Sequence, residues 1–374
     1  RHDGGYSTFR ADVTALLADS NVLIVEADNS KNDRVYPQKA DFTFYGGIYR
    51  DVSLLVVNRN HIALDYLGGP GVQITPTVNG ANADIEVKTW MEGDGEVEFS
   101  IYDAAGAEVL TGKGRDTTVT LEHPHLWDGV RDPYLYTCAV RLVLNGEVQD
   151  EVRQRFGVRS FSVDPKQGFF LNGRPYPLHG VSRHQDRKGL GNAITREMHD
   201  EDMQLIKELG ANTIRLAHYQ HDQYFYDLCD QYGMVVWAEI PYITMHMHNG
   251  RANTLTQMEE LIVQNYNHPC IAVWGLSNEI TAASAVNEEL LENHRALNEL
   301  AHRLDPTRPT TMANVFMLEI TSPILEIPDV NSYNLYFGWY LGELDQNDDF
   351  FDTYHAKYPD RCIGFSEYGA DANP

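Results

Sequence analysis

The stretch CIAVWGLSNE, residues 270–279, decides the fold together with VNEELLENHRALNELAHRLD, residues 286–305, which follows it. The first stretch begins as a nearly continuous apolar run, as expected for a strand of a parallel sheet that is covered on both faces. The second stretch is long enough for a helix and repeats its leucines at helical spacing. Together they predict one strand followed by one helix, and the strand ends on a carboxylate, Glu279.

The same alternation of strand and helix runs through the second half of the chain. We predict strands within residues 175–184, 211–219, 234–241, 270–279, 310–315, 330–338 and 361–369. Helices are predicted within residues 199–210, 222–233, 254–268 and 286–305. Because the sequence has no GxGxxG or GxxxxGK nucleotide loop, a (β/α)8 TIM barrel is favoured over an open sheet. Since the pattern stops after seven strands, we expect a truncated barrel and a piece of a longer protein, cut at both ends.

The first 163 residues show a different pattern, made of short strands alone. Alternating or β-branched runs, such as NVLIVEAD at 21–28 and DVSLLVV at 51–57, are separated by clusters of turn-forming residues. Many short strands at such spacing predict a β-sandwich. The sequence therefore predicts a β-sandwich region followed by a barrel.

Composition and charge exclude several kinds of partner. The 374 residues include 29 basic and 54 acidic side chains, a formal net charge of −25, which repels the phosphates of nucleic acid. No apolar run reaches the roughly 18 residues that a membrane span needs. No signal peptide is recognisable at the start, and we predict a cytoplasmic protein with no membrane partner. Four widely spaced cysteines without CxxC spacing predict reduced, mostly buried thiols.

Polar side chains gather at the carboxyl ends of the predicted barrel strands, where barrel enzymes carry their active sites. They are Arg183, His184, Arg215, His218, Tyr219, Glu239, Asn278, Glu279, Asn334, Tyr336, Glu367 and Tyr368. We interpret Glu239 as an ion-pair partner that holds Arg215 or another cation. Glu279 and Glu367 then remain as a pair of carboxylates. Such a pair suits glycoside hydrolysis, in which one carboxyl is a neutral acid and the other an ionised nucleophile.

Two pairs of histidines suggest a metal site, His218 with His221 and His246 with His248. The sequence has no HExxH motif, and no carboxylate stands at a convincing ligand spacing, so no metal site is predicted. We interpret His184 and His218 as neutral hydrogen-bonding groups for a polar ligand.

Three further residues are expected to contact a sugar. Asn278 precedes the predicted acid and offers an amide to the sugar 2-hydroxyl. Tyr336 and Trp339 belong to the aromatic stretch SYNLYFGWY at 332–340. We expect both near the ligand because sugar faces stack on aromatic rings, and tyrosine adds a hydroxyl.

Long motifs resemble family 2 of the glycoside hydrolases, the group of β-galactosidases, β-glucuronidases and β-mannosidases. NHPCIAVWGLSNE at 267–279 resembles the acid/base signature of that family. NTIRLAHYQHDQYFYDLCDQYGMVVW at 212–237 resembles its other signature, from which Leu216 and Gln220 depart. GGIYRDVSLL at 46–55 resembles the end of the N-terminal sugar-binding domain of the family.

The resemblance implies a retaining exo-β-glycosidase that works by double displacement through a covalent glycosyl-enzyme. By position, Glu279 resembles the acid/base and Glu367 the nucleophile. Substrate-binding roles are implied for Asp41, His184, His218, Asn278 and Tyr336, and we place Trp339 beside them. The implied domains are the C-terminal part of a jelly-roll at 1–56, an immunoglobulin-like β-sandwich at 57–163, and the barrel at 164–374.

The identity of the sugar is predicted from shorter motifs. SRHQDRKGLGNA at 182–193 and GFSEYGAD at 364–371 are more similar to the galactosidase branch, whereas NLYFGWY at 334–340 also resembles the NRYYGWY of the glucuronidases. We expect terminal β-D-galactosides as substrates. The alternatives are a β-glucuronidase and a non-catalytic carbohydrate-binding paralogue.

The resemblance also implies Na⁺ or Mg²⁺, and it is compatible with a homo-oligomer. A gapless comparison puts Ile243 and Met245 where the large β-galactosidases bind magnesium through a Glu and a His. We therefore expect that the Mg²⁺ site is not retained. The sodium ligands of the family would follow the seventh strand, outside this sequence.

Overall fold

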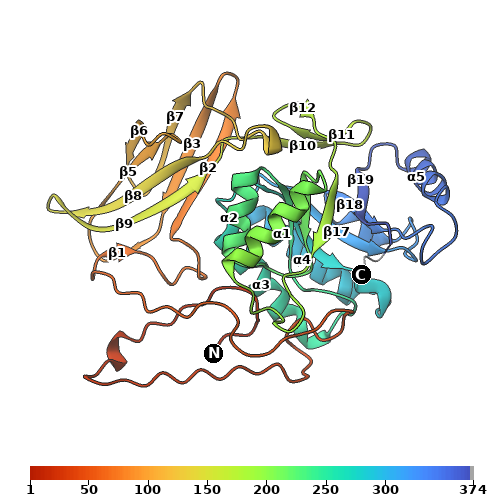
Figure 1. Cartoon of the computed structure of the whole chain (residues 1–374), viewed down its shortest axis with the longest axis horizontal. Helices are drawn as coiled ribbons and strands as arrows, with labels where there is room; N and C mark the ends of the chain where they lie inside the picture. The colour runs from red at the N-terminus through yellow and green to blue at the C-terminus, as the bar shows by residue number, and fades with distance from the viewer. Residues whose placement is uncertain (371–374) are drawn as a thin grey trace.

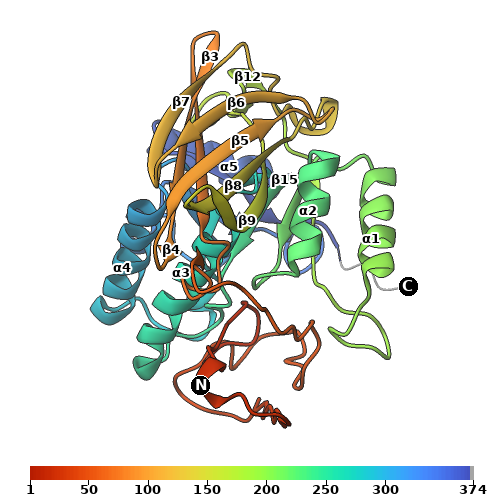
Figure 2. The same ribbon diagram turned by 90° about the vertical axis from the view of Figure 1, so that its left-hand side faces the viewer.

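The computed structural model describes residues 1–370, so the last four residues of the predicted barrel domain lie outside the described part (Figure 1). A β-sandwich and a helix-covered parallel sheet lie side by side, and the N-terminal segment runs beneath both. Figure 2 shows the same arrangement from the side. In the described residues, no helix has the length and apolar character needed to cross a membrane.

The second half of the chain forms one parallel sheet of seven strands in chain order, as the sequence predicts. The strands are β13 (Gly180–Arg183), β14 (Thr213–Leu216), β15 (Val235–Glu239), β16 (Ile271–Asn278), β17 (Thr310–Val315), β18 (Val330–Asn334) and β19 (Ile363–Glu367). Each strand pairs in parallel with the next one along the chain. This order is that of a TIM barrel, in which parallel neighbours are joined by helical crossovers.

Five helices accompany the sheet: α1 (Arg196–Glu208), α2 (Gln223–Tyr232), α3 (Arg251–Asn265), α4 (Glu288–Leu304) and α5 (Gln346–Lys357). The first four confirm the predicted helices. Two of them have clear caps: Asn287 accepts a hydrogen bond from Leu290 N at the start of α4, and Gly233 ends α2 with a φ of 73°. Helix α5 was not predicted, because its polar sequence buries only Tyr354.

The β-sandwich predicted within the first 163 residues is present, with its strands between residues 72 and 156. One sheet contains β2 (Val72–Asn79), β3 (Asn82–Thr89) and β7 (Asp116–Glu122), and the other contains β6 (Glu108–Lys113), β5 (Glu96–Tyr102), β8 (Tyr136–Leu144) and β9 (Glu147–Phe156). All pairs are antiparallel. Alternate residues of β3 are buried, as expected when one face of a strand points to the core.

Short elements connect and flank these two units. β1 (His61–Ile62) pairs with β4 (Met91–Glu92) beside the sandwich. β10 (Phe161–Asp164), β11 (Gly168–Leu171) and β12 (Arg174–Pro175) form a small antiparallel sheet before the first barrel strand. Where the barrel meets the sandwich, Gly233 lies so close to the carbonyl oxygen of Gly129 that a Cβ would approach it to 2.1 Å.

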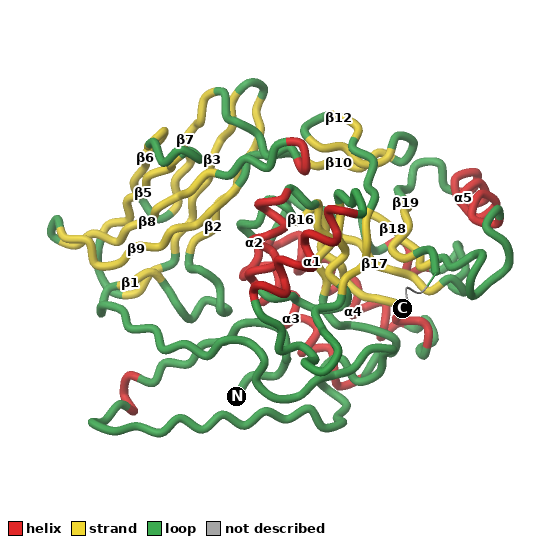
Figure 3. The backbone as a smooth tube through the Cα atoms, viewed as in Figure 1, coloured by secondary structure: helices red, strands yellow, loops and turns green. Residues whose placement is uncertain are grey.

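The strands predicted at 21–28 and 51–57 were wrong for this structure. Residues 1–60 contain no strand, only the short 3-10 helix η1 (Thr14–Leu16), and Figure 3 shows the segment almost entirely as loop. Val22 is 86% exposed, and the neighbouring apolar residues Leu23, Ile24 and Val25 are exposed as well. A β-branched run favours a strand, but a strand also needs a hydrogen-bonded neighbour, and these runs find none among the described residues.

Individual side chains attach the N-terminal segment to the barrel. Tyr36 is buried, its hydroxyl accepts a hydrogen bond from Met247 N at 2.6 Å, and its own N–H donates to Asn253 Oδ1 at 2.9 Å. Arg50 Nη2 donates to the carbonyl oxygen of Gln220 at 2.8 Å. The segment therefore lies against the barrel without joining its sheet.

Candidate active site

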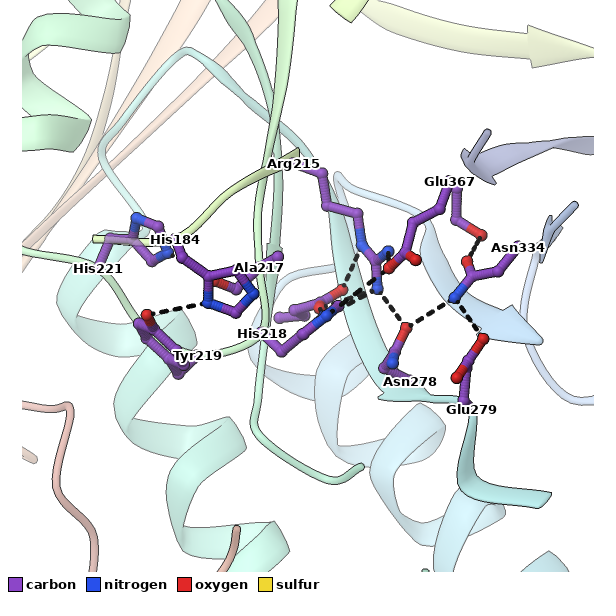
Figure 4. A network of polar contacts seen from close by, with 12 residues as sticks. His184, Arg215, Ala217, His218, Tyr219, His221, Asn278, Glu279, Asn334 and Glu367 are labelled. Atoms are coloured by element: carbon purple, nitrogen blue, oxygen red, sulfur yellow. Dashed lines mark hydrogen bonds and ion pairs between the residues drawn. The ribbon is translucent and has the colours of Figure 1, made fainter. Parts of the chain in front are cut away.

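The carboxyl ends of the barrel strands bring most of the predicted polar residues together (Figure 4). Two lie apart from them, since Arg183 pairs with Asp202 and Tyr368 is 59% exposed. Arg215 on β14 lies at the centre of the polar network and is 5% exposed, while its partner Glu239 at the end of β15 is 0% exposed. Nε and Nη2 of Arg215 each donate to a Glu239 oxygen at 3.0 Å. The predicted ion pair is confirmed, and the geometry is the bidentate one that favours arginine over lysine.

Arg215 also contacts two residues that the sequence analysis did not assign to it. Its Nη1 donates to Glu367 Oε1 at 2.6 Å, and its Nη2 donates to Asn278 Oδ1 at 2.7 Å. One guanidinium thus joins the ends of β15, β16 and β19. No sequence pattern gives this bridge, because the four residues are far apart along the chain.

Glu279 is held from the opposite side by β18. Asn334 Nδ2 donates to Glu279 Oε1 at 2.9 Å, and Asn334 Oδ1 accepts from Ser366 Oγ at 2.7 Å, next to Glu367. Glu279 itself has a φ of 44°, which is uncommon for a residue other than glycine and is frequent at functional sites. The turn directs its side chain into the network of Figure 4 instead of continuing the strand.

The environments of Glu279 and Glu367 shift the pKa values of their carboxyl groups in opposite directions. Burial raises the pKa of the Glu279 carboxyl above its ordinary value; the hydrogen bond from Asn334 opposes this shift, and the negative charge of Glu367 adds to it. Burial would also raise the pKa of Glu367, but the charges of Arg215 and His218 and the hydrogen bond from Tyr336 together outweigh it, so that pKa falls below its ordinary value. Glu279 is therefore the carboxyl more able to hold a proton, and Glu367 the one that stays ionised.

His184 and His218 line the same region. His218 Nδ1 lies 2.6 Å from Glu239 Oε1, and its Nε2 lies 3.6 Å from Glu367 Oε1. Burial, with the neighbouring His218, lowers the pKa of His184 to about 4, so His184 is neutral as predicted. Its Nδ1 lies 3.2 Å from the hydroxyl of Tyr219.

The remaining predicted residues lie around this centre. The Tyr336 hydroxyl donates to Glu367 Oε2, and the ring of Trp339 packs edge-on against Tyr336 at 5.4 Å between centroids. Asp41 is exposed, and its charge acts on both His184 and Glu279. The adjacent Phe42 ring lies 4.8 Å from that of His184. The N-terminal segment therefore reaches the site although it forms no strands.

The residues present do not fit the magnesium site of the large β-galactosidases. The side chains at its two expected positions, Ile243 and Met245, carry no oxygen or nitrogen, whereas Mg²⁺ needs oxygen ligands. Asp230, His268 and Cys270 form a compact cluster with ligand atoms within 4.8 Å of one another. Both Asp230 oxygens are already hydrogen-bonded, to His268 Nδ1 at 2.6 Å and to Cys270 N at 3.1 Å, so this cluster supports the turn before β16.

The four cysteines match the prediction of reduced thiols. All are free; Cys138, Cys229 and Cys270 are buried, and Cys362 is half-buried.

Comparison with known proteins identifies relatives of both halves. Residues 163–374 match the family model described as glycosyl hydrolases family 2, TIM barrel domain, and residues 68–159 match the model described as glycosyl hydrolases family 2. A β-glucuronidase of Bacteroides fragilis is 38% identical over 400 residues, which cover 100% of this chain and 56% of the relative.

Solved structures give the same picture. An FMN-binding β-glucuronidase from Faecalibacterium prausnitzii superimposes with a TM-score of 0.95 at 45% identity, covering 100% of this chain and 59% of that one. A putative β-galactosidase from Bacteroides fragilis gives a TM-score of 0.88 at 39% identity, covering 93% of this chain and 54% of that one. The chain thus spans little more than half the length of these relatives.

Proposed function

Because the chain belongs to family 2 of the glycosyl hydrolases, we propose that it carries the catalytic centre of a retaining exo-β-glycosidase that hydrolyses β-glucuronides. The observation that carries this proposal is the pair Glu279 and Glu367, whose environments move their pKa values in opposite directions. Two carboxyl groups whose pKa values differ in this way can supply a proton and a nucleophile at the same pH.

In the first step, Glu367 attacks the anomeric carbon of the sugar, and the bond from that carbon to the glycosidic oxygen breaks. Glu279 gives its proton to the leaving oxygen, so the aglycone departs neutral. Arg215 and Tyr336 keep Glu367 ionised and oriented, through the contacts at its two oxygens. The product of this step is a sugar esterified to Glu367.

In the second step, Glu279, now ionised, takes a proton from water, and the water oxygen attacks the anomeric carbon. The ester bond to Glu367 breaks, and the carboxylate returns to its contact with Arg215. Asn278 Oδ1 is occupied by Arg215, so its Nδ2 group is the one that donates to the sugar 2-hydroxyl. Asp41, His184, His218 and Trp339 surround the sugar in this proposal.

Support for a glucuronide comes from the relatives, since two of the three described above are named β-glucuronidases. They favour the glucuronidase alternative over the galactoside that the short motifs suggested. The second candidate, a β-galactoside, is favoured by the putative β-galactosidase structure. A homo-oligomer and a cytoplasmic location stay predictions.

The test is hydrolysis of a chromogenic β-glucuronide and a chromogenic β-galactoside by the protein. We expect the higher kcat/KM for the glucuronide and a covalent adduct on Glu367 after incubation with a 2-fluoro glucuronide. A preference for the galactoside would select the second candidate. Tight sugar binding with no turnover of either compound would instead identify a carbohydrate-binding paralogue.

A further inference from the structure

The strand that carries Glu367 contains an irregularity beside the proposed active site. Along the pairing of β18 with β19, Tyr333 lies opposite Phe365 and Asn334 lies opposite Glu367, so Ser366 is an extra residue in β19. Side chains of a regular strand alternate between its two faces, whereas an extra residue interrupts this alternation and redirects a side chain. Ser366 is therefore not fixed on the face opposite to that of Glu367.

The hydroxyl of Ser366 reaches the network that contains Glu367. Ser366 Oγ donates to Asn334 Oδ1 at 2.7 Å. Asn334 is 0% exposed, and among the described residues its Oδ1 accepts from Ser366 alone. Because a buried acceptor without a donor is unfavourable, this hydrogen bond holds the amide of Asn334 in place.

The other end of the Asn334 amide faces two oxygen atoms. Its Nδ2 donates to Glu279 Oε1 at 2.9 Å and lies 3.4 Å from Asn278 Oδ1 (Figure 4). An amide has donors on one side and an acceptor on the other, so the reversed orientation would place Oδ1 against both oxygens. Asn278 Oδ1 also accepts from Arg215, which connects the network back to Glu367.

The hydrogen bond from Asn334 is one of several influences on Glu279. Burial raises the pKa of the Glu279 carboxyl most strongly, and the hydrogen bond from Asn334 lowers it. The negative charges of Glu367 on β19 and Asp41 in the N-terminal segment also raise that pKa. His218, which follows β14, lowers it. Asn334 is the neutral donor in this set, so its orientation can change the proton affinity of Glu279 without any change in charge.

We propose that Ser366 is a positioning residue for Glu279, because it acts through Asn334 to keep an N–H donor against the proposed acid/base and thereby sets the alkaline limit of activity. The inference rests on the proposed function, since the acid must carry a proton that is lost at high pH. Without the Ser366 hydroxyl, the amide of Asn334 loses its anchor and can turn its oxygen toward Glu279. A protonated carboxyl can donate to that oxygen, so Glu279 should keep its proton to higher pH.

The experiment compares the pH dependence of kcat/KM in wild type and Ser366→Ala. With methyl glucuronide, whose leaving group needs the proton of Glu279, we expect the alkaline limb of the variant to move up by about half a pH unit or more. With dinitrophenyl glucuronide, whose leaving group departs without a proton, the alkaline limb should stay in place. A general loss of structure would lower activity with both substrates and would not extend it to higher pH.

Two variants serve as controls. Ser366→Thr keeps the hydroxyl and should keep the wild-type alkaline limb. Thr311→Val removes a buried hydroxyl of β17 that has no hydrogen-bond partner in the described part of the chain, and it should also leave the limb unchanged. Thermal unfolding checks that each variant folds.

Carbon NMR of protein with isotope-labelled glutamate measures the titration of Glu279 without a substrate, and Glu279→Gln identifies its signal. We expect a higher titration midpoint of Glu279 in Ser366→Ala than in wild type. An equal or lower midpoint, an unmoved alkaline limb with methyl glucuronide, or the same shift in Thr311→Val would overturn the inference. Absence of glycoside turnover by wild type would instead count against the proposed function, because the two midpoints can still be compared.

Discussion

Arg215 Nη1 lies 2.6 Å from Glu367 Oε1, and this contact links the proposed nucleophile to the buried core of the site. The same guanidinium is fixed by Glu239, so its position does not depend on a bound sugar. The negative charge of Glu367 is thus stabilised before substrate arrives, which is the form of preorganisation that lowers the barrier of a displacement.

Glu367→Gln should abolish turnover, because an amide cannot form the glycosyl ester. We expect kcat for a nitrophenyl glucuronide to fall by at least about a thousandfold, while the variant still folds and binds a substrate analogue. Glu343→Gln, a change at an exposed carboxylate, is the control and should keep wild-type activity. Near-normal turnover by Glu367→Gln would remove it as the nucleophile.

Arg215→Met should shift the acidic limb of the pH profile upward. The charge of Arg215 lowers the pKa of Glu367, so without it the carboxylate becomes protonated at higher pH and kcat/KM is lost earlier on acidification. We expect a shift of about one pH unit or more in the residual activity.

The same variant should lose about 3 to 5 kcal/mol in its free energy of unfolding, because the buried carboxylate of Glu239 is left without its positively charged partner. The control is Arg361→Met, which breaks an exposed pair with Glu326 and should cost less than about 1 kcal/mol. An unchanged acidic limb would show that Arg215 does not set the charge of Glu367.

Glu279→Ala should affect substrates according to their leaving group. A dinitrophenolate departs without a proton, so the first step should be nearly normal for a dinitrophenyl glucuronide. Methyl glucuronide needs the proton of Glu279, and its kcat/KM should fall by about a hundredfold or more. Single-turnover kinetics measures the first step, with exposed Glu319→Ala as the control. Equal losses for both substrates would argue against Glu279 as the acid.

Asp305 should carry part of the acid sensitivity of the fold. It is buried, lies 2.6 Å from Arg308 Nη1, and accepts from Trp274 Nε1 at 2.9 Å. Burial would raise its pKa, but the charge of Arg308 and the hydrogen bonds from Thr307, Arg308 and Trp274 together outweigh this and lower it. Since the pKa in the folded state lies below the unfolded value, the stabilisation is present above about pH 4 and disappears as the pH falls further.

Asp305→Asn should therefore unfold more easily near neutral pH, by about 3 kcal/mol or more, and lose less stability on acidification than the wild type. Urea unfolding between pH 3 and 7 measures both effects, and Asp360→Asn at an exposed position is the control. A parallel pH dependence of Asp305→Asn and wild type would refute the assignment.

The sequence predicted the barrel because its central strands, such as β16 and β17, are buried on both faces. In β17 every residue is buried, and in β16 the apolar run ends at the polar residues that form the site. Periodicity and strand order therefore locate Glu279 and Glu367 without coordinates. Their local environments could not be predicted, because the contacts from Asn334 and Arg215 depend on how strands far apart in sequence are aligned.

The errors have equally specific causes. Residues 21–28 have the composition of a strand, but no neighbouring strand pairs with them in the described chain. Glu289 was overlooked as a partner of His248 because a carboxylate contributed by a distant helix leaves no local spacing signal. The helix α5 lacks the apolar periodicity from which helices are recognised.

The N-terminal segment is attached to the barrel through Tyr36 and Arg50, so under the proposed function we expect substrate selection to be separable from chemistry. A few side-chain hydrogen bonds, instead of a β-ladder, keep Asp41 where its charge acts on His184 and Glu279. Loosening those hydrogen bonds would withdraw Asp41 while leaving the Arg215 network whole. Under the proposed function, we expect that changes in the N-terminal segment can alter which glycosides bind without altering the residues proposed to cleave them.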